Sequence, residues 1–216
     1  MALSTTPLDP ARTVLLVIDM QNDFLLPGAP LESPAGRAMI PTVNRAIESC
    51  RAAGIPVMFT AHAHRRSGTD MGAFARLYPP VAARAALIDG TPGTEIHAAL
   101  ARLATDELIK KHRYSAFFDT DLDTVLRGLD TRTVVVAGVT TEDCVQATAR
   151  DAMFRNFDTV VLSDACATYD HPDLGYGAMT AEQVHGASLV VLAQSTAHVM
   201  TVQQFASRLP LGRDPK

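Results

Sequence analysis

A cysteine, an aspartate and a lysine each follow an apolar run in this 216-residue chain. The runs have the composition of buried strands. They are residues 13–18 before Asp19, 107–110 before Lys111 and 133–137 before Cys144. A carboxylate can take the proton of a thiol, and an ammonium can hold the resulting thiolate. The three residue types therefore predict a nucleophile with a base and a stabilising cation.

The predicted fold brings these three residues together. In open α/β sheets, ligands bind where the carboxyl ends of the strands meet, so Asp19, Lys111 and Cys144 are expected at one edge. Cys144 also falls in the first turn of a predicted helix, where free amides and the helix dipole favour an anion. We expect this position to lower the pKa of the thiol. The alternative is that Cys144 is a small buried hydrophobic residue.

Strand-like and helical stretches alternate along the chain, which is the pattern of parallel β-α-β units. We predict a single α/β domain over residues 1–216, with three α/β/α layers around a doubly wound, six-stranded, mainly parallel sheet. The predicted strands are residues 13–18, 56–61, 107–110, 133–137, 158–163 and 188–193. The predicted helices are residues 37–53, 121–129, 142–156, 178–186 and 197–207.

Two segments are predicted to be irregular. Residues 62–97 are rich in glycine and proline and form a long insertion between strands, and such insertions in compact domains usually serve function. Residues 211–216 are predicted to be a frayed tail.

The composition is that of a globular chain, with 47% hydrophobic and 19% charged residues. A net charge of -4 and a pI near 5.9 give no basic stripe for nucleic acid. No apolar run reaches the length of a membrane span, and the first residues lack a charged segment followed by an apolar core, so we expect neither a span nor a leader sequence. We expect a cytoplasmic homodimer or homotetramer without nucleic-acid or membrane partners. Cys50 and Cys166 are predicted to be packing residues.

Three segments together resemble a known family. They are Val-Ile-Asp-Met-Gln-Asn-Asp-Phe at 17–24, Lys-His-Arg-Tyr-Ser-Ala-Phe at 111–117 and Gly-Val-Thr-Thr-Glu-Asp-Cys-Val at 138–145. In order and spacing they resemble the three signatures of the isochorismatase-like cysteine hydrolases. The resemblance runs from about residue 13 to about residue 205.

The resemblance implies a role for each reacting residue. Asp19 is the expected general base, Lys111 the stabilising cation and Cys144 the nucleophile. A cis peptide bond is implied between Val139 and Thr140. The amides of Thr140 and Cys144 are then expected to form an oxyanion hole for the substrate carbonyl.

Substrate contacts are predicted from several segments. The aromatic rings of Phe24, Phe118 and Tyr169 are expected to wall the pocket, although aromatic residues more often belong to the core. Arg65 either holds a substrate carboxylate or belongs to a solvated turn. His185 either contacts the carbamoyl end of the substrate or is structural. The predicted substrate-binding residues are Phe24, His62, Arg65, Phe118, Thr141 and His185.

A metal site is the alternative interpretation of His62 and His64. Both follow the second predicted strand, and alternation points their rings the same way. Metal-dependent nicotinamidases of this superfamily carry an aspartate and three histidines in this region. Here no suitably spaced third histidine precedes His97, so the ligand set is incomplete. We expect no metal and no cofactor.

The resemblance favours an amidohydrolase that cleaves a C–N bond of a small carbamoyl, ureido or amide compound. Ammonia is released and a thioester forms on Cys144. Residues 144–152 and 162–168 are most similar to ureidoacrylate, biuret and N-carbamoyl amino acid hydrolases. A nicotinamidase-like or other small-amide hydrolase is one alternative. The alternative from another class is a catalytically silent binding or redox-sensing member of the fold.

Overall fold

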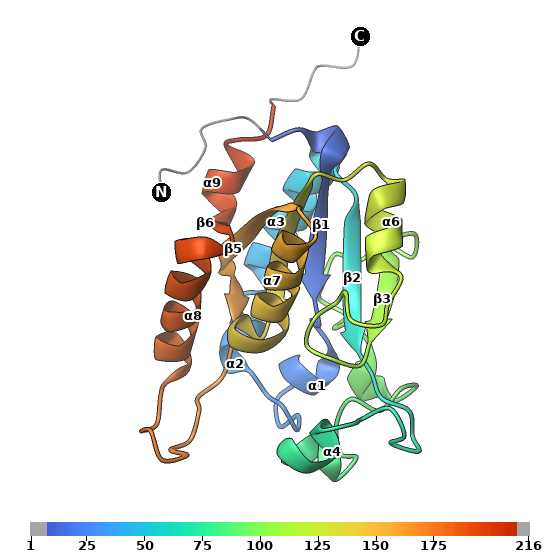
Figure 1. Cartoon of the computed structure of the whole chain (residues 1–216), viewed down its shortest axis with the longest axis vertical. Coiled ribbons are helices and arrows are strands. Elements are labelled where there is room, and N and C mark those ends of the chain that lie inside the picture. Colours follow the sequence, from blue (N-terminus) through green and yellow to red (C-terminus); the bar gives the residue numbers. More distant parts are fainter. Residues whose placement is uncertain (1–7, 211–216) are drawn as a thin grey trace.

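The computed structural model of the chain describes residues 8–210, and its centre is a six-stranded sheet (Figure 1). The strand order is β3-β2-β1-β4-β5-β6, and all five neighbouring pairs are parallel. The strands are β1 (Thr13–Ile18), β2 (Val57–His62), β3 (Glu107–Lys111), β4 (Thr133–Val139), β5 (Asp158–Ala167) and β6 (His198–Met200). The predicted doubly wound, six-stranded parallel architecture is confirmed.

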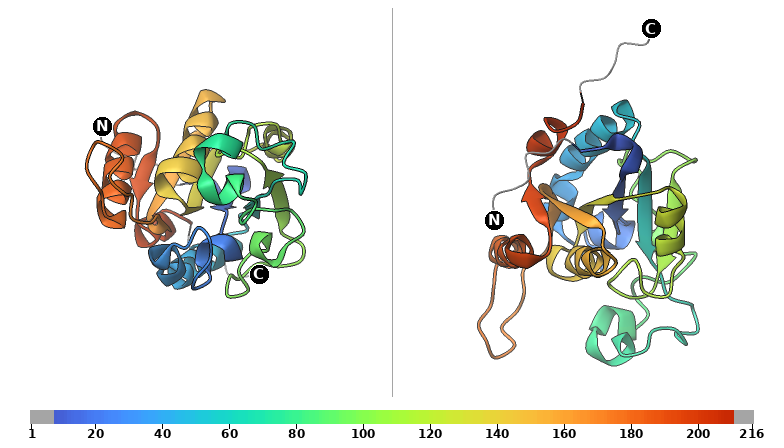
Figure 2. Two further views of the ribbon diagram at one scale, coloured as in Figure 1. Left: turned by 90° about the horizontal axis from the view of Figure 1, so that it is seen from below. Right: turned by 45° about the horizontal axis from the view of Figure 1, so that its top comes forward.

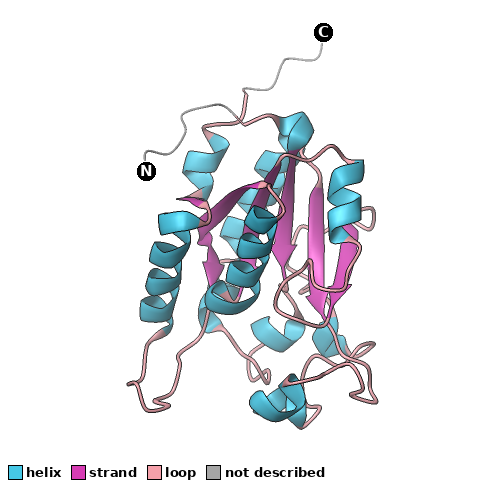
Figure 3. Cartoon of the chain, viewed as in Figure 1, coloured by secondary structure: helices cyan, strands magenta, loops and turns pink. Residues whose placement is uncertain are grey.

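Helices cover both faces of the sheet and complete three layers (Figure 3). The helices are α1 (Asn22–Leu25), α2 (Pro34–Ala38), α3 (Ile40–Ala52), α4 (Phe74–Leu77), α5 (Pro79–Ala82), α6 (Leu122–Gly128), α7 (Gln146–Phe154), α8 (Ala181–Ser195) and α9 (Val202–Ala206). Three short turns are η1 (Pro10–Arg12), η2 (Pro92–Thr94) and η3 (Thr141–Val145). Within residues 8–210, none of the helices is both long and apolar enough to cross a membrane.

The side chains of β1 show how the layers are built. All six residues of this strand are buried, because it lies in the middle of the sheet with helices on both sides. Leu15 and Val17 pack in the cluster formed with α3 and α9, and Leu16 packs with α6, α7 and α8. Cys50 and Cys166 are buried in these two clusters, as the sequence predicted for packing residues.

The predicted last strand at residues 188–193 is wrong, because these residues belong to α8. Thr180 begins this helix with a capping box to Gln183. Val184, Ser188 and Leu192 are its buried residues. This four-residue spacing is helical, and it leaves Val190 69% exposed. The helix predicted at 178–186 was therefore too short, because α8 continues to Ser195. The last strand is β6, and the helix predicted at 197–207 wrongly combined β6 with α9.

The middle of the sheet is where the chain reverses its direction of winding. β1 and β4 are neighbours, and the strands that follow each of them are added on opposite sides. Such a switch point opens a crevice at the carboxyl ends of the two strands. In Figure 1 these ends point down toward α1 and α4, and in the view from below α4 lies over the middle of the sheet edge (Figure 2).

Gly138 allows β1 and β4 to approach each other at this point. Its φ of 123° is unfavourable for residues with a side chain, and an added Cβ would collide with the backbone of Ile18. Asp19 follows Ile18, and Thr140 follows two residues after Gly138. The close approach therefore sets the distance between two strand ends that carry site residues.

Replacing Gly138 by Ala is expected to lower the free energy of unfolding by about 3 kcal/mol or more, because the methyl group strains φ and meets Ile18. Urea denaturation measures this change. The matched control is Gly186→Ala in the interior of α8, where an added Cβ meets no atom within 4 Å. The control should stabilise the protein by about 0.5–1 kcal/mol. Equal stability of the Gly138 variant and the wild type would contradict this account.

Candidate active site

Asp19 is held in place at the end of β1 by contacts from β2. It has a φ of 50°, which aspartate tolerates better than most residues, and it is fully buried. The Thr60 hydroxyl donates to Asp19 Oδ1 at 2.6 Å and accepts from the Asp19 amide at 3.1 Å. Thr60 therefore fixes the carboxylate. The sequence prediction did not include this role.

Gln21 joins the ends of β1 and β2 next to Asp19. Its side-chain amide donates to the carbonyl oxygens of His62 and Thr94, and its Oε1 accepts from the His62 amide at 2.8 Å. The side chain is fully buried. A buried amide with its donors and acceptor satisfied restricts the movement of the groups that it joins.

Lys111 lies between the other two predicted reacting groups. Its Nζ is 2.5 Å from Asp19 Oδ2 and 3.3 Å from Cys144 Sγ, and it donates to the Arg113 carbonyl at 3.0 Å. Burial alone would lower the pKa of Lys111. The neighbouring Asp19 and Cys144 outweigh that effect, and the pKa is raised. Lys111 is therefore a fully buried ammonium with all three donors used.

The expected lowering of the Cys144 pKa is wrong. Cys144 lies in η3 and is 3% exposed. Burial raises the pKa of its thiol, Lys111 opposes this effect, and the carboxyl groups of Asp19 and Asp143 add to it. Burial therefore favours the thiol over the thiolate. The thiol also hydrogen-bonds Asp19, the residue predicted to be the base.

The predicted cis peptide bond between Val139 and Thr140 is confirmed. Thr140 directly precedes η3, and it lines the same cavity as Cys144. An oxyanion hole formed by the amides of Thr140 and Cys144 stays a prediction.

A narrow cavity of about 20 Å³ lies beside Cys144. This is room for about one water molecule, so a substrate must displace part of the wall. The aromatic rings of the wall belong to Phe24, Phe74, Tyr78, Tyr114 and Tyr169. Its polar residues are His62, Thr140, Asp143 and Cys144. The insertion predicted at residues 62–97 supplies one side through α4 and α5, while Phe24 and His62 lie where the sequence predicted them.

Phe118 and Arg65 do not line the cavity. The loop after β3 buries Ala116 and Phe117, which turns Phe118 outward to 46% exposure. The Phe118 ring packs against the Arg113 guanidinium instead. Arg65 directly follows the inward-facing His64, so its side chain points outward and is exposed. Its backbone amide donates to the Asp70 carboxylate. The prediction that these two residues contact the substrate is therefore corrected.

Thr141 and His185 contact each other away from the cavity lining. The distance between Thr141 Oγ1 and His185 Nδ1 is 2.8 Å. His185 lies inside α8 and not just before the last strand, because this helix continues to Ser195. Burial lowers the pKa of His185. The two side chains thus join η3 to α8. Neither of them lines the cavity in which the substrate contact was predicted.

His62 and His64 form a buried pair with 3.2 Å between their Nε2 atoms. Burial lowers the pKa of both, and the Lys111 ammonium lowers that of His62 further. Neutral rings at this distance share one N–H. On the far side, His64 Nδ1 lies 3.7 Å from Asp70 Oδ1.

Asp19, His62 and Cys144 are the residues around His62 that could bind a metal ion. Donor atoms of Asp19, His62 and Cys144 lie within 4.8 Å of one another. The Lys111 ammonium already contacts the Asp19 and Cys144 atoms, so the chain supplies its own cation at this place. His97, the next histidine along the chain, lines a different cavity. These residues do not fit a metal ion while Lys111 keeps its contacts.

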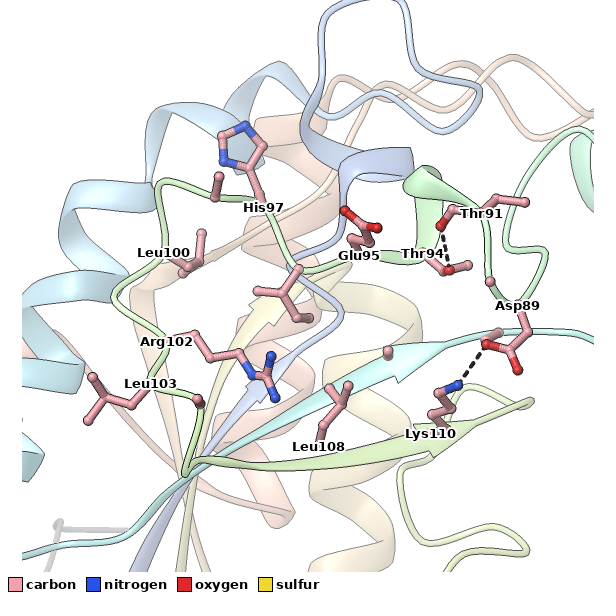
Figure 4. Close-up of a pocket in the computed structure, with 16 residues that line it drawn as sticks. Asp89, Thr91, Thr94, Glu95, His97, Leu100, Arg102, Leu103, Leu108 and Lys110 are labelled. Atoms are coloured by element: carbon pink, nitrogen blue, oxygen red, sulfur yellow. Dashed lines mark hydrogen bonds and ion pairs between the residues drawn. The ribbon is translucent and has the colours of Figure 1, made fainter.

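The larger cavity that contains His97 has a volume of about 610 Å³ and lies beside β2 and β3 (Figure 4). Lys110 and Asp89 form an ion pair on one side of it, while His97 lies on the opposite side. None of Asp19, Lys111 and Cys144 lines it. Cys144 lines the small cavity, so the small cavity is the candidate active site in spite of its size.

The sequence prediction missed Asp143 and two tyrosines of the cavity, Tyr78 and Tyr114, whereas Tyr169 lines the cavity as expected. Asp143 precedes the nucleophile, and its position in the first turn of the predicted helix was the available signal. Burial raises the pKa of Asp143 to about 6, Glu142 adds to this rise, and His171, Tyr114 and Lys111 oppose it. The Tyr114 hydroxyl hydrogen-bonds the Asp143 carboxyl. The hydroxyls of Tyr78 and Tyr169 contact each other.

Comparisons with known proteins show the family and the fold of the chain. The family model described as the isochorismatase domain matches residues 13–204. A probable inactive nicotinamidase of Arabidopsis thaliana is 37% identical over 72% of this chain and 81% of its own length. A ureidoacrylate amidohydrolase of Methylorubrum extorquens is 32% identical over 79% of this chain and 76% of its own length. The crystal structure of a cysteine hydrolase from Pseudomonas syringae superimposes with a TM-score of 0.91 at 34% identity, covering 97% of this chain and 98% of that one.

Replacing Lys111 by Met is expected to lower the free energy of unfolding by about 3–5 kcal/mol, because it leaves the Asp19 carboxylate buried without its cation. The double variant with Asp19→Asn should be less destabilised than Lys111→Met alone. Urea denaturation measures both. Lys110→Met is the matched control, since its ion pair with Asp89 is exposed and contributes less than about 1 kcal/mol. A Lys111 variant as stable as this control would contradict the proposed role of the ion pair.

The raised pKa of Asp143 makes its contribution to stability depend on pH. The folded protein holds the proton more tightly than the unfolded chain, whose aspartate has a pKa near 3.8. The protonated Asp143 carboxyl group therefore stabilises the folded protein fully below about pH 4. This stabilisation is lost as the pH rises through about 6. Relative to wild type, Asp143→Asn should gain stability across this interval and change little above it. Unfolding in urea at about pH 4.5, 5.5, 6.5 and 7.5 measures the difference. A constant difference would refute the assignment.

Proposed function

The chain belongs to the isochorismatase family, and on that premise we propose that it is a cysteine-dependent amidohydrolase. It cleaves a C–N bond of a small carbamoyl, ureido or amide compound and releases ammonia. The observation that carries this proposal is the contact of the Lys111 ammonium with both Asp19 and Cys144, at the wall of the cavity that Cys144 lines. The ureidoacrylate amidohydrolase among its relatives supports the type of bond.

The first half of the reaction forms the thioester. Asp19 takes the Cys144 proton while Sγ attacks the substrate carbonyl carbon. The negative charge on the carbonyl oxygen is stabilised by the amides of Thr140 and Cys144. Asp19 then gives its proton to the leaving nitrogen, the C–N bond breaks, and ammonia departs.

The second half restores the thiol. Asp19 takes a proton from a water molecule that attacks the thioester carbonyl, and the C–S bond breaks. The proton returns to Sγ, and the product is a carboxylic or carbamic acid. Lys111 stays charged throughout and stabilises whichever of Asp19 and Cys144 carries the negative charge. This arrangement supports a mechanism in which proton transfer and attack occur together, because the resting thiol has a raised pKa.

The name of the Arabidopsis relative favours a second candidate, a catalytically silent member that keeps the fold for binding. The three side chains that the reaction needs argue for the hydrolase. A silent binding protein has no need for a buried lysine between a carboxyl group and a thiol, since such groups cost free energy to bury.

Cys144→Ala is expected to keep the fold and lose ammonia release by at least about three orders of magnitude, because the nucleophile is gone. Asp19→Asn should be nearly as inactive, since groups that act as a unit are not additive. Ammonia release from ureas, carbamoyl amino acids and primary amides measures this, with and without EDTA. Acid-quenched wild type should carry an acyl group on Cys144 by mass spectrometry. Activity of Cys144→Ala above a few per cent would reject the covalent mechanism, and loss of activity with EDTA would reject the metal-free one.

A further inference from the structure

The cavity holds one carboxyl group that the proposed reaction does not use. Asp143 lines the cavity next to Cys144, and it is part of the same turn η3. The Tyr114 hydroxyl hydrogen-bonds its carboxyl group. Asp143 is thus exposed to the same cavity as Cys144, within reach of a small molecule bound there.

Among the residues that the structure describes, the cationic groups near the cavity already have partners: Arg113 packs on the Phe74 ring and donates to two backbone carbonyls, and His171 contacts Glu142. None of the residues lining it is an arginine or a lysine. The Lys111 ammonium behind them has all its donors used. His62 is neutral because burial lowers its pKa. Glu142, beside Asp143, accepts from the Thr168 hydroxyl at 2.7 Å and adds a further negative charge. A substrate carboxylate would therefore meet repulsion and no partner.

The aromatic walls of the cavity also favour a positively charged ligand. Five aromatic rings surround the cavity, including those of Tyr78, Tyr114 and Tyr169. The faces of aromatic rings attract cations, and rings together with a carboxylate are the usual chemistry for binding an ammonium group. The carboxylate supplies the countercharge that a buried ammonium requires.

We propose that Asp143 is the specificity-determining residue of this site, and that the substrate is a small primary amide whose far end carries an ammonium group. The inference rests on the proposed amidohydrolase function and narrows its substrate class. It replaces the expectation that Arg65 holds a substrate carboxylate, since Arg65 is exposed and does not line the cavity. The ureidoacrylate hydrolysed by the Methylorubrum relative carries a carboxylate, so this chain is expected to differ from that enzyme in substrate.

Three amides of equal length test the charge preference. They are β-alaninamide with an ammonium, butyramide with a methyl group and succinamate with a carboxylate. At pH 7.5, kcat/KM for ammonia release should follow this order, with about 100-fold or more between the first and the last. Succinamate hydrolysed as well as β-alaninamide would overturn the inference.

Substitution of Asp143 tests the residue itself. Asp143→Asn should lower the ratio of kcat/KM for β-alaninamide over butyramide by about 10-fold or more, mainly through KM. Glu142→Gln is the matched control, because it removes a neighbouring charge whose side chain does not line the cavity. The control should keep the ratio within about 3-fold, a spread typical of surface charge effects. If Asp143→Asn keeps the wild-type ratio, Asp143 does not determine specificity. If Asp143→Asn fails to fold, the same ratio is measured with Asp143→Ala, and the same decrease is expected.

The pH profile gives a readout that a structural role of Asp143 would not move. The wild-type ratio should fall as the pH drops below about 6, because Asp143 is then protonated. The groups that face it are Glu142, His171, Tyr114 and Lys111. In Asp143→Asn the ratio should stay constant over the same interval. A wild-type ratio that is independent of pH would count against the inference.

Binding to Cys144→Ser separates this inference from the proposed function. Calorimetric titration with the same three compounds requires no turnover. If wild type releases ammonia from none of them but Cys144→Ser binds β-alaninamide at least about 10-fold more tightly than succinamate, the amidohydrolase proposal fails and the charge preference stands. Equal binding of the two compounds, or binding of neither, overturns the charge preference.

Discussion

The Lys111 ammonium is fully buried, and a buried cation is stable only where anions and carbonyl oxygens replace its water. Asp19, Cys144 and the Arg113 carbonyl do this, and each comes from a different part of the sheet edge. The same contacts that stabilise the ammonium also form the reacting group. The stability of the folded chain and the geometry of its candidate chemistry therefore depend on one interaction, and a change that moves any partner affects both.

The sheet provides the rigidity that this interaction needs. Thr60 in β2 holds the Asp19 carboxylate, and Gln21 ties the ends of β1 and β2 by bonds to both. Gly138 lets β4 approach β1 closely enough for η3 to begin beside Asp19. Groups placed at the ends of buried strands move less than groups on loops.

The sequence was sufficient to place Asp19, Lys111 and Cys144 near one another, because each lies at or beyond the carboxyl end of its own strand and parallel strands bring these ends to one edge. It was insufficient for Phe118 and His185, whose positions depend on how a loop turns and where a helix ends. Residues 188–193 were misjudged because a uniformly apolar run has no clear period. These residues are helical because they continue the helix that begins at the Thr180 cap, eight residues earlier in the chain. The pKa of Cys144 was misjudged since burial, which local sequence does not reveal, outweighed the effect of its position in a helical turn.

Asp143 connects specificity with the nucleophile, because its carboxyl group is among the causes that raise the pKa of the Cys144 thiol. An ammonium group bound to Asp143 would offset that negative charge within the same cavity. The thiol would then lose its proton to Asp19 more readily when a cationic substrate is bound than when the site is empty. Charge selection at one end of the substrate would in this way also assist the reaction at the other. An uncharged substrate would lack this assistance even where it fits the cavity equally well.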